Sequence, residues 1–204
     1  GLAMSGSHVI AAVEIDRKAV ETYKLNHPSV RLYGEDIRSL SPESMLSDLG
    51  LQVGQLDLLA GCPPCQSFSR LRKLNRTRAL ADPRNALIED FTRFALAMRP
   101  KQIMMENVPG LSLHHRFSKM LAAFKRDGYK VRWEILDVQD FGVPQRRKRL
   151  IVSASRINAP AMAAPSLVKN TVRIALDGLG KPGQSGDAIH DIKERRSEKV
   201  TEII

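Results

Sequence analysis

Residues 56–66 read Leu-Asp-Leu-Leu-Ala-Gly-Cys-Pro-Pro-Cys-Gln. The apolar run over 56–60 has the length and composition of a buried β-strand, and the glycine and prolines that follow end it in a tight loop. In α/β proteins, reactive groups lie at the carboxyl ends of parallel strands. This segment therefore predicts a strand that carries a cysteine-bearing loop to the ligand-binding edge of a sheet.

Short apolar runs alternate with segments of helical period on both sides of this strand. The residues between Asp36 and Leu56 are interpreted as a polar connection, and residues 70–84 as a basic surface loop. The order predicts an α/β fold with a Rossmann-like, doubly wound, mostly parallel sheet that has an antiparallel pair at its edge. The predicted strands are 9–13, 30–33, 56–60, 103–105, 130–136 and 149–154, and the predicted helices are 19–25, 85–98 and 116–126.

Composition favours a single soluble domain with a polyanionic partner. The 204 residues include 32 Lys and Arg against 22 Asp and Glu, a formal net charge of +10. Such a balance is compatible with nucleic-acid binding, although charge alone does not identify the partner. No apolar run has the length of a membrane span, and the start has no signal-peptide pattern. We expect a cytosolic protein that binds no membrane.

The two cysteines, Cys62 and Cys65, leave two interpretations open. A zinc site would need further cysteine or histidine ligands at matching spacing, and the five histidines show no such pair. No metal is therefore predicted. The spacing is compatible with a redox pair, or with a catalytic thiol at Cys65 beside an uninvolved Cys62.

Glu14, Asp36, Cys65 and Glu106 all fall at the predicted carboxyl ends of strands. In doubly wound folds, an acid at such a position commonly accepts hydrogen bonds from the ribose of an adenosine cofactor. The other reading of Glu14 is an acid that stabilises a helix N-terminus. The cysteine is either a nucleophile in a loop or a packed small side chain.

Four motifs, in order and at compatible separations, resemble those of DNA cytosine-5 methyltransferases. They are Glu14-Ile-Asp16, Gly61-Cys-Pro-Pro-Cys-Gln-Ser-Phe-Ser69, Glu106-Asn-Val108 and Gln145-Arg-Arg-Lys-Arg149. The resemblance implies a class I S-adenosylmethionine-dependent fold and methylation of C5 of a flipped-out cytosine in double-stranded DNA. It also implies a bacterial restriction-modification methylase, monomeric, with a restriction endonuclease as a genetic partner only. A cytosine-5 methyltransferase of RNA and an inert nucleic-acid-binding remnant remain alternatives.

The resemblance also assigns roles to individual residues. Cys65 is the nucleophile that attacks C6 of cytosine, Glu106 contacts the N3/N4 edge of the base, and Arg147 and Arg149 engage its O2 side and the flanking backbone. The residues that it places near the cofactor S-adenosylmethionine are Glu14, Ile15, Asp36, Ile37, Pro64 and Leu87. Those that it places near DNA are Gln66, Ser67, Ser69, Arg70, Arg72, Lys73, Asn107 and Gln145, and the basic run over 70–78 is alternatively a solvated charged surface.

The family normally opens with a strand that ends in Asp-Leu-Phe and a glycine-rich turn, and it continues into a target-recognition domain. Neither opening feature is present in this sequence. The resemblance therefore predicts a catalytic domain over residues 1–156 that lacks its first strand. It predicts a linker over 157–204 that approaches an absent recognition domain, and this fragment alone is expected to have little or no activity.

Overall fold

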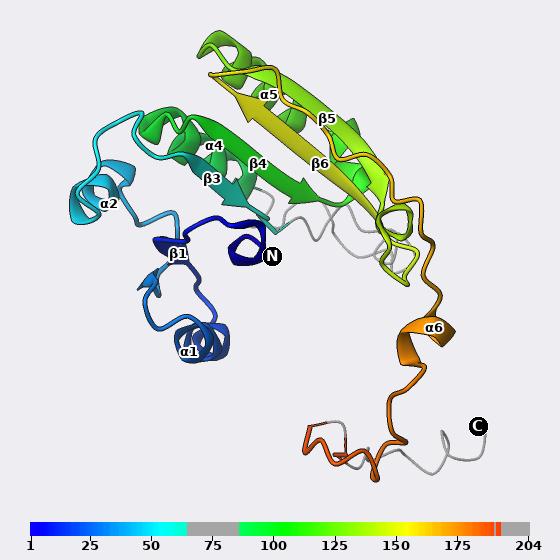
Figure 1. Cartoon of the computed structure of the whole chain (residues 1–204). Coiled ribbons are helices and arrows are strands. Elements are labelled where there is room, and N and C mark those ends of the chain that lie inside the picture. The colour runs from blue at the N-terminus through cyan, green and yellow to red at the C-terminus, as the bar shows by residue number, and fades with distance from the viewer. Residues whose placement is uncertain (65–85, 190, 193–204) are drawn as a thin grey trace, which may run out of the picture. The chain divides into compact units, whose positions relative to one another are not determined.

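The computed structural model describes residues 1–64, 86–189, 191 and 192, and Figure 1 shows the arrangement of its elements. The chain groups into two compact units: residues 1–137 with 148–164, and residues 138–147 with those from 165 onward. The strands are β1 (Ala11–Val13), β2 (Arg31–Tyr33), β3 (Leu58–Gly61), β4 (Gln102–Asn107), β5 (Lys130–Asp137) and β6 (Lys148–Ser155). The helices are α1 (Arg17–Asn26), α2 (Pro42–Asp48), α4 (Leu87–Met98), α5 (His115–Arg126) and α6 (Val172–Leu176), with short 3-10 turns at Ala3–Ser5, Pro109–Leu113 and Val138–Phe141.

The described strands form two sheets. β1 and β2 pair in parallel, and a four-stranded sheet has the order β3-β4-β6-β5. β3 is parallel to β4, whereas β6 runs antiparallel to both β4 and β5. The predicted α/β class and the antiparallel pair at the sheet edge are confirmed, and the four-stranded sheet is mixed.

Helices α4 and α5 pack on one face of the four-stranded sheet (Figure 1). The core there joins Phe91 of α4 and Phe124 of α5 to alternate residues of β4 and β6, such as Met105 and Val152, all at most 5% exposed. Burying such large apolar side chains contributes roughly 1.5–3 kcal/mol each. A second cluster, around Phe94 and other residues of α4, joins this helix to α2 and the two-stranded sheet.

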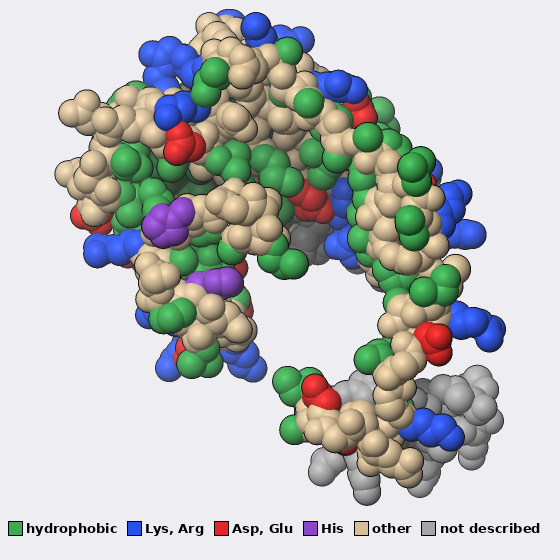
Figure 2. Space-filling view, viewed as in Figure 1, with side chains coloured by type: hydrophobic (Ala, Val, Ile, Leu, Met, Phe, Trp, Pro, Cys, Tyr) green, Lys and Arg blue, Asp and Glu red, His purple; other side chains and the backbone are tan. Residues whose placement is uncertain are grey.

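The opposite face of the four-stranded sheet carries the other set of alternating side chains. Because successive side chains of a strand point to opposite faces, burial of Ile103 and Met105 beneath the helices places Met104 and Glu106 on this second face. By the same alternation, Arg149 and Ile151 of β6 share it. Figure 2 shows hydrophobic side chains exposed over this part of the molecule, with charged side chains close by.

Helix α2 corrects one sequence interpretation. The residues between Asp36 and Leu56 are not simply a polar connection, because Pro42–Asp48 is helical and buries Met45 and Leu46. Its start carries an ordinary helix signal: the Ser41 side chain accepts a hydrogen bond from Ser44 N, and proline occupies the first turn. The interpretation failed because the helix is short and its apolar face has only a few residues.

Candidate active site

The carboxyl end of β4 and the start of β6 bring together an acid and an arginine from the predicted site. Nε of Arg149 lies 2.5 Å from Oε1 of Glu106. The two side chains are only 19% and 30% exposed, so the ion pair is partly shielded from water. Arg149 also donates a hydrogen bond from Nη1 to the carbonyl of Lys148 at 2.8 Å. The structure therefore places the predicted Glu106 and Arg149 in direct contact.

Cys62 is the third member of this group. Gly61 of β3 is the register partner of Met105 of β4, so Cys62 follows beside Glu106. The Cys62 side chain is exposed there, just beyond the end of β3. Partial burial, and then the negative charge of Glu106, raise the pKa of the Cys62 thiol above its ordinary value. Cys62 is thus a protonated neighbour of Glu106 at neutral pH.

Asn107 fixes the loop that leads toward Cys65. Its side chain is buried, and Nδ2 donates a hydrogen bond of 2.8 Å to the carbonyl of Pro63, while Oδ1 accepts one of 2.9 Å from Val108 N. The backbone of β4 and the proline loop after β3 are therefore tied together by one amide side chain. Among the described residues, Asn107 therefore has a structural role, that of holding the proline loop. The sequence predicts that Asn107 lies near DNA.

Gly61 is required by a close approach of α4 to the end of β3. A Cβ atom built on Gly61 would lie 2.5 Å from Cε2 of the Phe91 ring, well inside van der Waals contact. Because the ring is part of the core, it has little freedom to move. The glycine of the cysteine motif therefore lets helix and strand pack closely just before the loop.

At the end of β1, the Glu14 carboxylate folds back on the chain. Its Oε1 accepts hydrogen bonds of 2.9 Å from the backbone N–H groups of Ile15 and Asp16. Asp16 in turn caps α1, because its side chain accepts from Ala19 N at 2.8 Å. Ile15 is 63% exposed, an unusual degree for an apolar side chain between two acids. The motif therefore combines a helix cap with an accessible carboxylate and an apolar contact surface.

Asp36 lies three residues beyond the end of β2, which is paired with β1. Arg38 donates to both of its carboxylate oxygens, from Nε to Oδ1 at 2.9 Å and from Nη2 to Oδ2 at 2.5 Å. These hydrogen bonds, with one from the Arg38 backbone, lower the pKa of Asp36 to about 2. Asp36 is therefore charged throughout the neutral range.

Arg93 is a supporting residue that sequence reasoning missed. From α4, its guanidinium donates to the carbonyls of Ile37 at 2.8 Å and Leu40 at 3.0 Å, which holds the turn after β2. Ile37 itself packs against the second core cluster, so its side chain has a structural role. The available signal was one arginine on an amphipathic helix, which does not reveal the partner.

The remaining predicted residues divide into described and undescribed positions. Pro64 is exposed and Leu87, the first residue of α4, is half-buried. Gln145 and Arg147 are exposed in the second unit, where Arg147 O accepts from Val138 N at 3.1 Å. The predicted nucleophile and six predicted DNA contacts lie outside the described residues: Cys65, Gln66, Ser67, Ser69, Arg70, Arg72 and Lys73.

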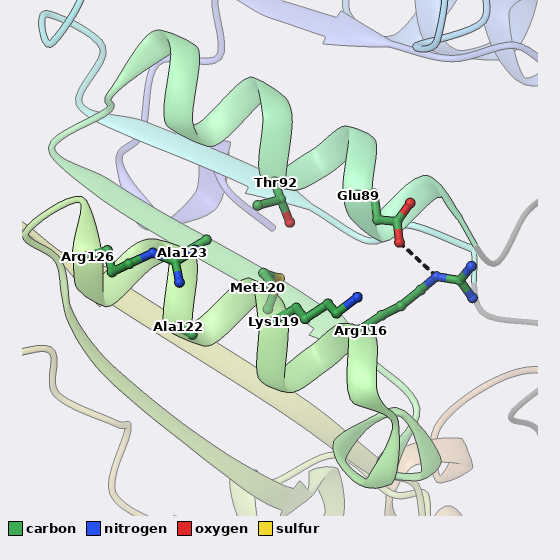
Figure 3. Close-up of a pocket in the computed structure, with 8 residues that line it drawn as sticks. All are labelled: Glu89, Thr92, Arg116, Lys119, Met120, Ala122, Ala123 and Arg126. Atoms are coloured by element: carbon green, nitrogen blue, oxygen red, sulfur yellow. Dashed lines mark hydrogen bonds and ion pairs between the residues drawn. The ribbon is translucent and has the colours of Figure 1, made fainter.

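A separate hollow of about 460 Å³ lies between α4 and α5. Figure 3 shows Arg116, Lys119 and Arg126 extending along it from α5, with Glu89 of α4 paired to Arg116 at 2.9 Å. None of the predicted site residues lines this hollow. In the described part of the chain, no group of three or more metal-ligating side chains occurs, and no helix is both long and apolar enough to cross a membrane.

Comparisons with known proteins agree with this arrangement. The sequence pattern of the family described as C-5 cytosine-specific DNA methylase matches residues 1–202. Type II methyltransferase M.DdeI of Desulfomicrobium norvegicum is 38% identical over 178 residues, which is 82% of this chain and 41% of that protein. Type II methyltransferase M.XorII of Xanthomonas oryzae pv. oryzae is 32% identical over 202 residues, 97% of this chain and 44% of that protein.

Solved structures show the same fold. A prophage-encoded DNA modification methyltransferase of E. coli superposes with a TM-score of 0.70 at 27% identity, over 87% of this chain and 50% of that one. Spodoptera frugiperda DNMT2 superposes with a TM-score of 0.61 at 24% identity, over 97% of this chain and 56% of that one. The chain thus spans about half the length of these proteins or less. Because the family pattern covers nearly the whole sequence, the chain belongs to the C-5 cytosine-specific DNA methylase family.

Proposed function

We propose that this chain carries the catalytic residues of a methyltransferase that modifies C5 of cytosine in double-stranded DNA. The observation that supports this most is the group at the ends of β3, β4 and β6, where Glu106 is paired with Arg149 beside the strand that leads to Cys65. An acid and a guanidinium at this edge can bind the polar rim of a pyrimidine. The supporting comparison is the family match over residues 1–202.

The cofactor of this family is S-adenosylmethionine, and the ends of β1 and β2 fit an adenosine group. Two carboxylates, Glu14 and Asp36, follow neighbouring parallel strands, and the exposed Ile15 offers an apolar surface next to the first. We propose that Glu14 accepts from the ribose hydroxyls and Asp36 from the adenine amino group. Pro64 and Leu87 would then line the methionine end. When bound, the cofactor supplies an electrophilic methyl group.

The chemistry begins with the Cys65 thiolate, which forms a bond to C6 of cytosine. Addition would make C5 nucleophilic toward the electrophilic methyl group that the bound cofactor supplies. The C5–methyl bond would form as the methyl–sulfonium bond breaks and S-adenosylhomocysteine leaves. Transfer of the C5 proton to solvent and loss of the Cys65 thiolate would then restore the C5–C6 double bond. Glu106 hydrogen-bonds the N3/N4 edge of the base, where charge accumulates as the thiolate adds. Arg149 binds at O2, and Arg147 engages O2 or the adjacent phosphate.

A cytosine within a stacked duplex does not expose C5 and C6, so we propose that the base is flipped into this site. The basic run that follows Cys65 supplies charge for the phosphates around the flipped nucleotide. We propose contacts there for Arg70, Arg72 and Lys73, with Gln66, Ser67, Ser69 and Gln145 contributing hydrogen bonds. Asn107 acts by fixing the loop, as its contact with Pro63 indicates.

At the level of the whole protein, we propose a monomeric restriction-modification methylase of the bacterial cytosol. Residues 1–156 would supply the catalytic domain, and residues 157–204 would lead toward a target-recognition domain. The relatives whose names identify them as Type II methyltransferases support this assignment.

The test uses the protein at its natural length, with methyl-labelled S-adenosylmethionine and duplex DNA, and compares wild type with Cys65→Ser. We expect label on C5 of cytosine in wild type and none in the variant, which lacks the nucleophile. A mechanism-based probe, DNA with 5-fluorocytosine, should trap wild type covalently and leave Cys65→Ser free. Label on RNA but not on DNA, or undiminished transfer by Cys65→Ser, would overturn the proposal.

A further inference from the structure

We propose that Arg93 of α4 is a positioning residue for the adenine end of the cofactor site. The placement of the cofactor at the ends of β1 and β2 rests on the proposed function, whereas the contacts of Arg93 do not. The guanidinium does not touch the cofactor. It acts through the backbone of the turn over residues 36–40, which follows β2 and carries the Asp36 carboxylate.

The hydrogen bonds of Arg93 reach both halves of this turn. Nη2 donates to the carbonyl oxygen of Ile37 at 2.8 Å, and Nη1 donates to that of Leu40 at 3.0 Å. Nη2 also lies 3.2 Å from Oδ1 of Asp90, one turn earlier in α4, and this acid steadies the guanidinium. Two donors on one planar group fix direction as well as distance, which the single ammonium group of a lysine does not.

The backbone alone closes this turn unevenly. Ser39 N donates to the carbonyl oxygen of Asp36 at an ordinary 2.9 Å. Leu40 N lies 3.4 Å from the carbonyl oxygen of Ile37, which is long for an N–H···O bond. The side chains of Ile37 and Leu40 pack against the second core cluster, but apolar contacts are non-directional. Arg93 therefore supplies the directional contacts that orient the turn on α4.

Two arginines have different roles at this carboxylate. Arg38 pairs with Asp36 from within the turn and sets the direction of the carboxylate relative to the turn. Arg93 sets where the turn as a whole lies on α4. The same helix begins at Leu87, the residue proposed to line the methionine end, roughly 9 Å along the axis at 1.5 Å per residue. One helix thus fixes the spacing between the two ends of the proposed cofactor site.

The first test measures the turn without cofactor, in the protein at its natural length. Arg93→Met removes the donors but keeps an apolar stem, and exchange of the Ser39 and Leu40 amide hydrogens is followed by NMR. We expect exchange to be about 2- to 10-fold faster, the range for one net hydrogen bond, because the turn opens more often. The matched control, Arg116→Met on α5, removes an arginine that is paired with Glu89 of α4 and should leave both amides unchanged. Unchanged exchange in Arg93→Met would overturn the inference.

The second test measures cofactor affinity in calorimetric titrations with S-adenosylhomocysteine. Arg93→Met should weaken binding about 2- to 10-fold, no more than loss of the Asp36 hydrogen bond itself, because it acts through that carboxylate. Arg93→Lys keeps the charge but reaches one carbonyl at a time, so it should recover part of the loss. Arg116→Met should stay within about twofold of wild type.

The inosine analogue of S-adenosylhomocysteine separates positioning from a general loss of stability. In this analogue a carbonyl oxygen replaces the adenine amino group from which Asp36 is proposed to accept. We expect wild type to prefer the adenosine form, and Arg93→Met to lose most of that preference while binding the analogue about as wild type does. Equal weakening of affinity for both ligands would contradict positioning and indicate a structural role.

The titrations also distinguish failure of the inference from failure of the proposed function. If wild type methylates cytosine in DNA and Arg93→Met binds both ligands as wild type does, the inference alone is overturned. If wild type binds S-adenosylhomocysteine but methylates no DNA, the result counts against the proposed function alone, and the affinity ratios still decide the role of Arg93. A wild type that does not bind S-adenosylhomocysteine would overturn both.

Discussion

Two pairs of strand ends hold their carboxylates in different ways. At the ends of β1 and β2, Glu14 accepts from the two residues that follow it, and Asp36 is paired with Arg38 two positions away. Where the end of β4 meets the start of β6, Glu106 is paired with Arg149, which is remote along the chain and lies on a separate strand. The first pair is held locally, the second by the tertiary fold.

The difference has a physical consequence for each function. Local contacts form in any chain that adopts the turn, so the carboxylates at β1 and β2 keep their orientation when packing elsewhere loosens. Contacts between strands exist only when the sheet register is correct. A group that must meet a reacting base within a fraction of an ångström benefits from that rigidity.

The largest effect is expected from Glu106→Gln, which removes the acid but keeps the length of the side chain. The rate constant of methyl transfer should fall by about 10²–10⁴-fold, the usual contribution of a positioned acid or base. Single-turnover assays with labelled S-adenosylmethionine measure it directly. Cofactor affinity should change little, because the acids at β1 and β2 are untouched.

A matched control for this change is Glu134→Gln. Glu134 is the register partner of Ile151, which also pairs with Glu106, and its carboxylate lies 2.5 Å from Arg132. Because that ion pair lies on the edge strand β5, away from the ends of β4 and β6 where Glu106 meets Arg149, its loss should leave the rate within about twofold. Similar losses in both variants would mean that charge on this face, rather than the Glu106 contacts, controls the reaction.

A second prediction tests the packing of α4 against the end of β3, on which the tertiary contacts depend. Gly61→Ala places a Cβ atom against the Phe91 ring, so we expect a loss of about 1–3 kcal/mol in the free energy of unfolding, as for other overpacked core positions. Urea unfolding measures this loss. The control is Gly34→Ala after β2, where a Cβ atom would meet Val20 at an ordinary 3.7 Å. If Gly61→Ala is as stable as Gly34→Ala, the close approach does not constrain β3.

The sequence predicts the order of strands and helices well because apolar runs and helical period are local signals. The segment over residues 56–66 correctly predicts β3. Helix α1 ends at Asn26, before His27 and Pro28, and α5 ends at Arg126, before Gly128, whose φ of +88° suits glycine. Helix α2 is not predicted from the sequence, despite Ser41 and Pro42 at its start, because a helix of two turns has too few apolar residues for its period to stand out.

The site is predictable in its members but not in its contacts. Glu106 and Arg149 are named by motif, yet their contact with each other depends on the register of β4 and β6. Arg93 holds the turn after β2 only because of how α4 is rotated on the sheet. Such facts arise from pairing between distant segments, which no local pattern contains.

The smallest effect is expected at the locally held strand ends. Asp36→Asn keeps the size of the side chain but removes its charge, so affinity for S-adenosylhomocysteine should fall about 2- to 10-fold, as for one hydrogen bond, in calorimetric titrations. Pairing with Arg38 lowers the pKa of Asp36 from 3.8 to about 2, so the stabilisation it contributes is present above about pH 4 and disappears only as the pH falls toward 2.

This carboxylate therefore stays charged across the neutral range, and the ratio of wild-type to Asp36→Asn affinity should be the same from about pH 6 to about pH 8. The control is Asp48→Asn, an exposed acid that is paired with Arg31 on β2. It should not change cofactor affinity. Equal weakening of cofactor affinity by both variants would indicate a general effect of charge. A wild-type to Asp36→Asn affinity ratio that varies with pH would mean that the Asp36–Arg38 pair opens when cofactor binds. The contrast between locally held Asp36 and tertiary-held Glu106 would then hold only for the protein without cofactor.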